Sequence, residues 1–301
     1  MNVLSLFDGM SCGQIALNQL GLKPARYYAA EIKKHAIKVT LANYPDTVEV
    51  GDVRKISYKD GVLHTENGDY EAGRIDLLIG GSPCQDLSIQ MADRKGLAGD
   101  KSSLFWEYVR IMREVQPRFF LLENVASMPA HDAAIITKTI GVAGVCINSA
   151  LVSAQTRNRY YWTNIPGTGY DLFSTGLISQ PADRNIMLKD ILEHGRTDRK
   201  KAYCLTARGG GRWAHVYKDE KYKADNIQKQ MLHRYAKGFD NVVFEDGYVR
   251  LLSRREMERL QTVPDGYTDS VTEVEAADLL GDGWTVEVIK HLFKQLKYID
   301  L

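Results

Sequence analysis

Short apolar runs alternate with amphipathic stretches over the first half of the chain. Runs rich in β-branched and aromatic residues, typical of buried strands, occupy residues 3–7, 26–31, 48–53, 75–81, 118–125 and 145–154. Apolar residues at helical spacing lie between several of these runs, at residues 13–21, 34–44 and 103–115. This rhythm predicts βαβ units around a mostly parallel sheet, with a further strand at 158–165.

The alternation then stops. No hydrophobic period is sustained over residues 167–248, where Gly-rich, Lys-rich and aromatic pieces dominate. Helical patterns resume at 253–263, where Ser253 and Glu256 have the spacing of a capping box, and again at 281–298. We therefore expect an α/β domain over 1–166, a small irregular lobe over 167–248 and C-terminal helices over 249–301 that return to the first domain.

Charge is distributed unevenly along the chain. The 301 residues carry a net charge of +1, yet the segment from Arg196 to Lys237 holds twelve Lys and Arg against four Asp and Glu, a local excess of +8. Such a stretch is either a solvated face or a phosphate-binding surface, and charge alone does not decide between them.

Composition excludes several classes of protein. The four cysteines lie far apart, without a CxxC pair or a Cys/His cluster, so we expect neither a zinc site nor a disulfide framework, and no metal. No run approaches the roughly 20 apolar residues that a membrane-spanning helix requires. The N-terminus reads directly into a strand rather than a targeting segment, and we expect a cytoplasmic protein.

A glycine turn follows the first predicted strand. Phe7-Asp8-Gly9 and Gly13 lie between this strand and the next helix, where a ligand can approach the backbone at a helix N-terminus. The G-x-x-x-G spacing differs from the G-x-G-x-x-G dinucleotide fingerprint, so the turn by itself is as well explained by tight packing. Glu31 stands 22 residues after Gly9, where an acidic side chain would meet ribose hydroxyls.

Further polar residues follow the next strands. Asp52 comes after the third strand, where it could accept a hydrogen bond from an adenine amino group. Each acid alone is explained as a surface carboxylate, but acids at successive strand ends favour a nucleoside cofactor. Cys84 follows the strand at 75–81, and Glu123 ends the strand at 118–125, which predicts a thiol and a carboxyl group facing one pocket. A lone cysteine would more often be a small buried apolar residue.

Taken together, these motifs resemble the DNA cytosine-5 methyltransferase family. They occur in that family's order: FDGMSCG at 7–13, Glu31, Gly51-Asp52-Val53, GSPCQDLS at 81–88, LLENV at 121–125, QTRNRYYW at 155–162, LSRREMERLQTVP at 252–264 and GDGWTVEVIKHLF at 281–293. Details such as FDG, RYYW and ILEHGR are most similar to the catalytic domain of animal de novo methyltransferases. The chain length resembles instead that of a bacterial or phage enzyme.

The resemblance implies a fold and a reaction. The fold would be a Rossmann-like sheet that binds S-adenosylmethionine, with the irregular lobe as the DNA-recognition region. The thiolate of Cys84 would add to carbon 6 of a flipped-out cytosine, so that carbon 5 can take up the methyl group. Glu123 would hydrogen-bond N3 and the exocyclic amine, and Arg159 with Arg157 would bind the base carbonyl and a flanking phosphate.

The resemblance also assigns the remaining site residues. The cofactor residues would be Phe7, Asp8, Gly9, Gly13, Glu31, Ile32, Asp52, Val53, Pro83, Asp282 and Trp284. The DNA contacts would be Gln85, Ser88, Lys200, Lys201, Thr206, Arg208 and Arg212. The partner would be double-stranded DNA in a bacterial or phage-infected cell, and relatives of this kind can act beside a companion restriction enzyme. The arginines of the lobe could read base edges or contact only phosphates.

Asp282 is a departure from the family pattern, because bacterial members usually carry asparagine in this segment. An amide can donate to the carboxylate or hydroxyls of S-adenosylmethionine, whereas an ionised Asp can only accept. The alternative is that Asp282 caps a helix beginning near Trp284.

Three rival functions follow from the same residues. An RNA methyltransferase of the same fold would act on tRNA, and a DNA-binding subunit without activity would lack the Cys84, Glu123 and Arg159 set that is present here. A NAD-linked oxidoreductase would be expected to carry the missing G-x-G-x-x-G fingerprint.

Overall fold

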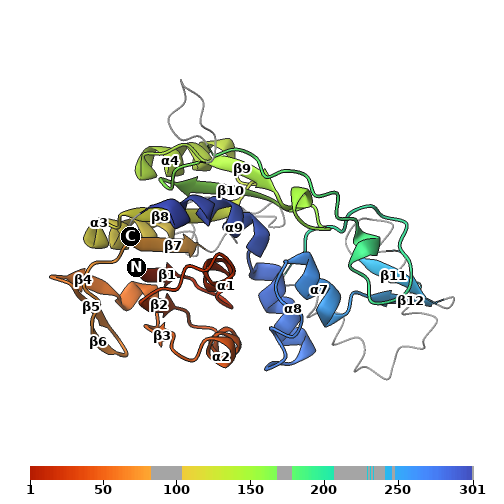
Figure 1. The fold of residues 1–301 in the computed structure, drawn as a ribbon, viewed down its shortest axis with the longest axis horizontal. Helices are drawn as coiled ribbons and strands as arrows, with labels where there is room; N and C mark the ends of the chain where they lie inside the picture. Colours follow the sequence, from red (N-terminus) through yellow and green to blue (C-terminus); the bar gives the residue numbers. More distant parts are fainter. Residues whose placement is uncertain are drawn as a thin grey trace. The chain divides into compact units, whose positions relative to one another are not determined.

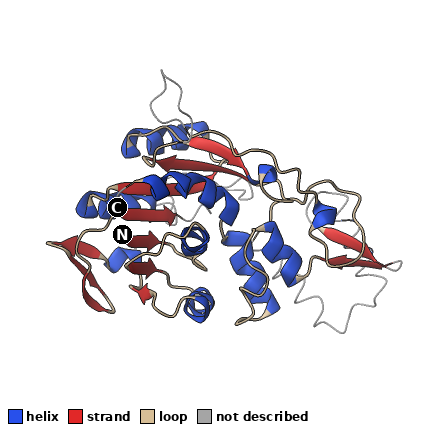
Figure 2. Cartoon of the chain, viewed as in Figure 1, coloured by secondary structure: helices blue, strands red, loops and turns tan. Residues whose placement is uncertain are grey.

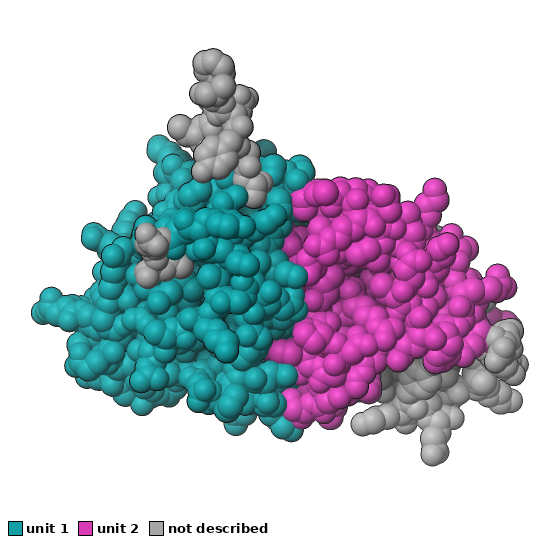
Figure 3. All heavy atoms as spheres, in the orientation of Figure 1, with its two compact units in different colours: residues 1–147, 158–180, 289–301 teal, residues 148–157, 181–288 magenta. Residues whose placement is uncertain are grey.

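The computed structural model describes residues 1–82, 104–167, 178–206, 229, 231, 233, 241–245 and 248–299. The chain forms two compact units (Figure 3). Unit 1 comprises Met1–Ile147, Asn158–Gln180 and Ile289–Leu301, and unit 2 comprises Asn148–Arg157 and Pro181–Val288. These bounds differ from the predicted ones: residues 249–288, expected to return to the first domain, belong to unit 2, and only 289–301 return.

Unit 1 is built on a seven-stranded sheet (red in Figure 2). Its strands are β1 (Asn2–Leu6), β2 (Arg26–Ala30), β3 (Val48–Glu49), β7 (Leu77–Gly81), β8 (Phe119–Val125), β9 (Val145–Asn148) and β10 (Asn158–Thr163). The order is β3-β2-β1-β7-β8-β10-β9. The first five of these pair in parallel, and β10 pairs with β8 antiparallel. The prediction of a parallel-rich α/β sheet is therefore confirmed.

Helices α1 (Cys12–Gln19), α2 (Lys34–Asn43), α3 (Leu104–Val115) and α4 (Ala130–Ile140) connect the strands of this unit (Figure 1). Buried residues of α3 and α4, such as Phe105 and Ile136, share one core with Leu4 and Leu78 of the sheet. Alternate strand residues face the opposite side of a sheet. The sequence reading placed three of these helices and missed α4.

The end of β7 is fixed by close packing at Gly80. A Cβ atom on Gly80 would lie 3.0 Å from the Leu6 carbonyl oxygen and 3.0 Å from the ring of Tyr108 on α3. No larger side chain fits without moving the helix or the neighbouring strand. The strand therefore delivers the residues that follow it to a defined position at the carboxyl edge of the sheet.

An antiparallel meander, absent from the sequence prediction, follows the third strand of the sheet. It contains β4 (Ser57–Lys59), β5 (Val62–Thr65) and β6 (Gly68–Glu71), and the 3-10 helix η1 (Val53–Lys55) leads into it. Asp60 and Gly61 both have positive φ, 51° and 87°, as a two-residue type I′ turn requires. Leu63, fully buried, ties the meander to the core of unit 1.

The described part of unit 2 includes the helices α7 (Arg254–Leu260) and α8 (Glu273–Asp282) and a two-stranded sheet of β11 (Val242–Glu245) and β12 (Tyr248–Leu251). The predicted capping box is confirmed: Ser253 Oγ accepts from the Glu256 N–H, and the Glu256 carboxylate accepts from the Ser253 N–H. The division between the two units falls inside α9 (Val286–Phe293), and a 3-10 helix, η5 (Lys294–Tyr298), follows it.

Two fully buried carboxylates on α7 organise unit 2. Glu256 accepts two hydrogen bonds of 2.8 Å from Arg250, and Glu258 accepts from Arg255 at 3.0 Å and from the Thr268 hydroxyl at 2.6 Å. Buried charges remain in a fold only when they are paired and hydrogen-bonded in this way. None of the described helices has both the length and the apolar character needed to cross a membrane.

Candidate active site

The glycine turn between β1 and α1 is held by hydrogen bonds to Asp8. Phe7, Gly9 and Ser11 have positive φ of 55°, 60° and 62°. The Asp8 carboxylate accepts from the Ser11 hydroxyl at 2.6 Å and from the Tyr27 hydroxyl at 2.8 Å. Burial raises the pKa of Asp8 to about 6. The carboxylate of Asp8, a predicted cofactor residue, thus forms hydrogen bonds that hold the turn itself. Gly13, another predicted cofactor residue, lies buried in the first turn of α1.

Glu31 joins the end of β2 to this turn. Its carboxylate accepts from the Gly9 N–H at 2.8 Å, and also from the N–H groups of Ile32 at 2.8 Å and Lys33 at 2.9 Å. A carboxylate has about four acceptor positions, so Glu31 retains capacity for a hydroxyl donor. The neighbouring Ile32 side chain is 66% exposed, although large apolar side chains are mostly buried. A carboxylate next to an exposed apolar side chain suits a nucleoside.

Asp52 follows β3 and caps η1. Its carboxylate accepts from the Arg54 N–H at 3.0 Å and forms an ion pair with the Arg54 side chain. The hydrogen bond from the Arg54 side chain is the main cause of its lowered pKa, so the group is an ionised acceptor at neutral pH. Val53 begins η1, and the first N–H groups of a helix have no acceptor within it. Asp52 and Val53 therefore place an acceptor and a donor side by side.

Glu49 is a titratable group of this edge that sequence reasoning missed. It ends β3 in register with Ala29 of β2, and one of its carboxyl oxygens, Oε2, is buried without a hydrogen-bond partner. Burial, reinforced by the charges of Asp8 and Glu31, raises its pKa to about 8. Glu49 is therefore mostly protonated at neutral pH, which lowers the negative charge beside the glycine turn.

Glu123 and Arg159 form an ion pair at the far end of β8. In the β8–β10 ladder Glu123 lies opposite Tyr161 and Arg159 opposite Val125, so the two are diagonal neighbours on one face. Arg159 Nε lies 2.9 Å from Glu123 Oε1, and the two side chains are only 15% and 11% exposed. The pair offers a carboxylate acceptor and a guanidinium donor at one place.

Asn124 connects this strand end to the segment that leads to Cys84. Gly81 of β7 is in register with Glu123, and Asn124 Nδ2 donates to Ser82 Oγ at 3.1 Å and to the Ser82 carbonyl at 3.3 Å. Asn124 is 1% exposed, so this contact is shielded from water. The predicted residues Pro83, Cys84, Gln85 and Ser88 lie outside the described residues. The structure thus fixes the chain two residues before Cys84.

Comparison with known proteins identifies the family. A family model described as "C-5 cytosine-specific DNA methylase" matches residues 1–144 and 147–298. The chain belongs to this family. The resemblance seen in the motifs is therefore confirmed.

Curated members of the family include phage and bacterial enzymes. The orphan methyltransferase M.SPRI of Bacillus phage SPR is 32% identical over 208 residues, which make up 65% of this chain and 43% of the phage protein. The chain thus spans less than half of that relative's length. The type II methyltransferase M1.ScrFI of Lactococcus lactis subsp. cremoris is 26% identical over 320 residues, covering 98% of this chain and 77% of the relative.

Solved structures share the fold. Entamoeba histolytica methyltransferase EhMeth has a TM-score of 0.65 at 14% identity, covering 98% of both chains. The S. pombe Dnmt2 methyltransferase has a TM-score of 0.62 at 18% identity, covering 98% of this chain and 99% of that one. This chain therefore shares the fold of these methyltransferase structures.

Two cations that the sequence assigned to the base or to DNA are used inside unit 2. Arg157 is 3% exposed and donates to the carbonyls of Leu205 and Gly283 at 3.0 and 2.9 Å, while its Nη1 lies 3.1 Å from Cys204 Sγ. Lys201 Nζ donates to three carbonyls, those of Ala150, Ser153 and Ile186, at 2.6, 2.9 and 2.6 Å. Both cations are thus held by backbone carbonyls of unit 2, and contacts of Arg157 with the base or a phosphate stay a prediction.

The other predicted residues of the lobe have different surroundings. Lys200 is exposed and Thr206 is half-buried, whereas Arg208 and Arg212 lie outside the described residues. DNA contacts by these four stay a prediction. Asp282 and Trp284 belong to unit 2, and their role toward a cofactor also stays a prediction.

The helix-capping alternative for Asp282 is wrong. Asp282 is the last residue of α8, and the next helix begins only at Val286. The sequence reading missed α8 and therefore took the glycine-flanked aspartate for a helix start. Residues at the end of a helix cannot supply the N-cap of the next one three residues on.

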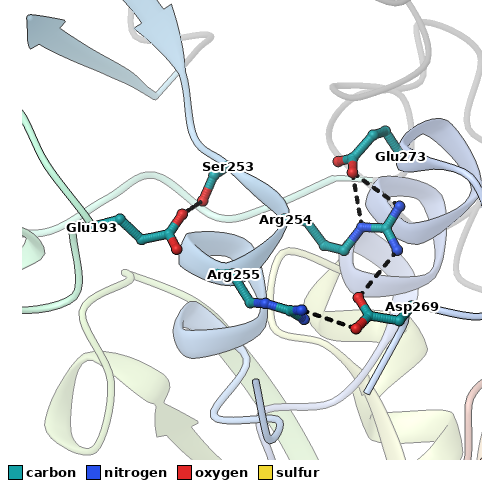
Figure 4. Close-up of a pocket in the computed structure, with 6 residues that line it drawn as sticks. All are labelled: Glu193, Ser253, Arg254, Arg255, Asp269 and Glu273. Carbon is teal, nitrogen blue, oxygen red and sulfur yellow. Dashed lines mark hydrogen bonds and ion pairs between the residues drawn. The ribbon is translucent and has the colours of Figure 1, made fainter. Parts of the chain in front are cut away.

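An open polar pocket of about 600 Å³ in unit 2 is lined by residues that pair with one another (Figure 4). Arg254 pairs with Glu273 at 2.9 Å, and Arg255 pairs with Asp269 at 2.9 Å. Glu193 and Ser253 complete the lining, linked by a 2.6 Å hydrogen bond. None of the six lining residues is a predicted site residue, and we assign this pocket a structural role.

The raised pKa of Glu49 predicts a pH dependence. A group that binds its proton more tightly in the folded state stabilises the fold at low pH and loses that contribution as pH rises through its folded pKa, here about 8. We expect wild-type stability to fall from about pH 6.5, above the range of Asp8, to about pH 8 and then to level off, and Glu49→Gln to flatten this fall. Urea unfolding across this range measures it. Glu71→Gln, an exposed change on β6, is the control, and an unchanged pH slope in Glu49→Gln contradicts the assignment.

The contacts of Lys201 predict a different outcome for two neighbouring lysines. Lys201→Met removes three charge-assisted hydrogen bonds and should lower the free energy of unfolding by about 2–4 kcal/mol. Lys200→Met, at an exposed position, should change it by less than about 0.5 kcal/mol. Denaturant unfolding of both variants tests this. Equal, small effects would show that Lys201 is free to bind phosphate after all.

Proposed function

We propose that this protein transfers a methyl group from S-adenosylmethionine to carbon 5 of cytosine in DNA. The observation that carries the proposal is the Glu123–Arg159 pair, joined through Asn124 to the segment that leads into Cys84. Family membership gives the reaction class, and the pair supplies the chemistry that a cytosine ring requires.

The pair matches the polar edge of cytosine. The guanidinium of Arg159 can donate to the base carbonyl O2, while the carboxyl group of Glu123 can accept from the exocyclic amine and share a proton with N3. Holding a proton at N3 withdraws electrons from the C5–C6 double bond. This favours attack by a nucleophile at C6, because the negative charge that develops on the ring is neutralised.

Cys84 is the nucleophile in this proposal. Its thiolate forms a bond to C6, and the electron pair of the C5–C6 bond moves to C5, which becomes an enamine carbon. S-adenosylmethionine supplies the electrophilic methyl group that C5 takes up. Loss of the C5 proton to a base, which a water molecule could serve as, then restores the double bond and releases the thiolate.

The residues at the carboxyl edge of β1, β2 and β3 fit an adenosyl group. Glu31 retains acceptor positions for ribose hydroxyls, and the exposed Ile32 suits one face of adenine. The ionised Asp52 can accept from the adenine amine, and the Val53 N–H can donate to N1. The carboxylates Glu31 and Asp52 also suit a ligand that carries a positive sulfonium.

DNA is the proposed substrate because the family model describes a DNA methylase and the curated relatives include type II methyltransferases. The target atom of cytosine is buried in duplex DNA, so the base must leave the stack at a cost of a few kcal/mol. The basic segment from 196 to 237 would offset part of that cost through phosphate contacts. Transfer of tritiated methyl groups to DNA and, in parallel, to tRNA separates the two substrate classes.

The covalent step makes a direct test of Cys84. Duplex DNA with 5-fluorocytosine should form a complex with the wild type that survives denaturing electrophoresis, because fluorine cannot leave as a proton does. Cys84→Ala should form none and lose transfer entirely, while its affinity for S-adenosylmethionine stays within about threefold. Methyl transfer by the Ala variant would overturn the mechanism.

The proton at N3 makes a second test, of Glu123. Glu123→Gln keeps the shape of the side chain but removes its acid–base function, so we expect kcat to fall about 10²- to 10⁴-fold. Calorimetric titration with S-adenosylmethionine provides the control, because this ligand should bind the variant as it binds the wild type. A kcat within about threefold of the wild type would remove Glu123 from the reaction.

A further inference from the structure

The tip of the β5–β6 hairpin, whose strands are labelled in Figure 1, is hydrogen-bonded to the turn that carries Asp52. The two-residue loop of this hairpin consists of Glu66 and Asn67, because Thr65 pairs with Gly68. Glu66 Oε1 accepts from the Asp52 N–H at 3.0 Å, and Asn67 Nδ2 donates to the Glu49 carbonyl at 2.9 Å. Both ends of the short segment 49–52 are therefore held by the hairpin tip.

Gly51 leaves the space that this contact needs. It has φ of +81°, and a Cβ atom there would lie 2.6 Å from Glu66 Oε1. The left-handed backbone conformation thus favours a glycine, and a side chain there would displace the Glu66 carboxylate from its present position. The turn and the hairpin tip are shaped to each other.

Glu66 remains ionised in this position. It pairs with Lys55, and this hydrogen bond, together with the Asp52 N–H, holds its pKa below the usual range. An ionised carboxylate accepts a stronger hydrogen bond from a backbone N–H than a neutral group does. The contact therefore persists at neutral pH although the Glu66 side chain is 34% exposed.

The hairpin does not need this contact for its own packing. Leu63 is fully buried in the core of unit 1, and Tyr58 and Tyr70 pack against the same core. The Tyr58 hydroxyl also donates to the Gly73 carbonyl at 2.8 Å. The tip residues Glu66 and Asn67 are exposed and contribute no apolar burial. Their polar contacts instead determine where the backbone between Glu49 and Asp52 lies.

We propose that Glu66 and Asn67 are positioning residues that set the selectivity of this site for adenine. They position the backbone that carries the Asp52 carboxylate and the adjacent Val53 N–H, an acceptor and a donor that match the amine and N1 of adenine. Hypoxanthine has a carbonyl and an N–H at these two positions, so it presents the reverse pattern. The inference rests on the proposed S-adenosylmethionine site.

The selectivity for adenine over hypoxanthine distinguishes a positioning role of Glu66 and Asn67 from a general contribution to the stability of the fold. A loosened turn would weaken the adenine contacts and relax rejection of the wrong base, whereas ribose and amino acid contacts of the ligand would be kept. A site built to hydrogen-bond one ligand has a much lower affinity for an analogue that leaves the polar groups of the site unpaired. The ratio of two affinities is therefore the readout.

The experiment measures the affinity of the full chain for S-adenosylhomocysteine and for S-inosylhomocysteine by calorimetry. We expect the wild type to prefer the adenosyl ligand at least tenfold. Glu66→Ala should lower this preference about three- to tenfold, and Asn67→Ala should lower it less. Glu66→Gln, which keeps an oxygen to accept from the Asp52 N–H, should retain most of it.

Asp69→Ala is the matched control on the same hairpin. Asp69 pairs with His64 at 2.9 Å, and its side chain is 67% exposed. This variant should keep wild-type selectivity. Thermal melting of each variant verifies that it is folded at the temperature of the titration.

The outcomes separate this inference from the proposed function. If Glu66→Ala and Asn67→Ala bind both ligands with wild-type selectivity, or lose affinity for both equally, the positioning role is wrong and the cofactor site stands. If the wild type binds both ligands equally well, the adenine edge is not read by Asp52, and the inference falls. If the wild type binds neither ligand, the proposed cofactor falls, and the inference with it.

Discussion

The parallel pairing of β7 between β1 and β8 is the constraint on which the candidate site depends. It brings Gly81 into register with Glu123, so the chain that leaves β7 passes Asn124 and is bonded to it at Ser82. The pairing requires a residue without a side chain at position 80, where the Leu6 carbonyl and the Tyr108 ring come within 3.0 Å of a Cβ atom. A displaced β7 would separate the segment that leads to Cys84 from Glu123.

The carboxylates at the carboxyl edge of the sheet are stabilised by hydrogen bonds and ion pairs with other groups of the protein. Three N–H groups satisfy Glu31, the Arg54 side chain satisfies Asp52, and Arg159 satisfies Glu123. A ligand must therefore share or replace these contacts. The free energy gained on binding is then smaller than the number of new hydrogen bonds suggests. Glu49 has no such partner for its buried oxygen, and it binds a proton instead.

The elements that could be predicted from the sequence are those whose signal lies within a few neighbouring residues. Buried strands, the glycine turn and the Ser253–Glu256 capping box are read from runs of a few residues. The meander at 57–71 carried similar signals, Asp60-Gly61 and Asn67-Gly68, and α8 carried Thr272 with Glu275, which were overlooked. Arg157 and Lys201 could not be read in this way, because only the tertiary fold places carbonyl groups around a cation.

The position of Asp282 illustrates how a corrected helix boundary changes a functional argument. A carboxylate at the C-terminus of a helix faces the negative end of the helix dipole, which disfavours it by about 0.3–1 kcal/mol. Asp282 ends α8 and is exposed, so helix stability gives no reason for an acid there. Of the two roles that the sequence left open, capping is excluded, and the contact with the cofactor stays a prediction. An ionised Asp can only accept, so in that role it would face the ammonium or the ribose hydroxyls more favourably than the carboxylate of S-adenosylmethionine.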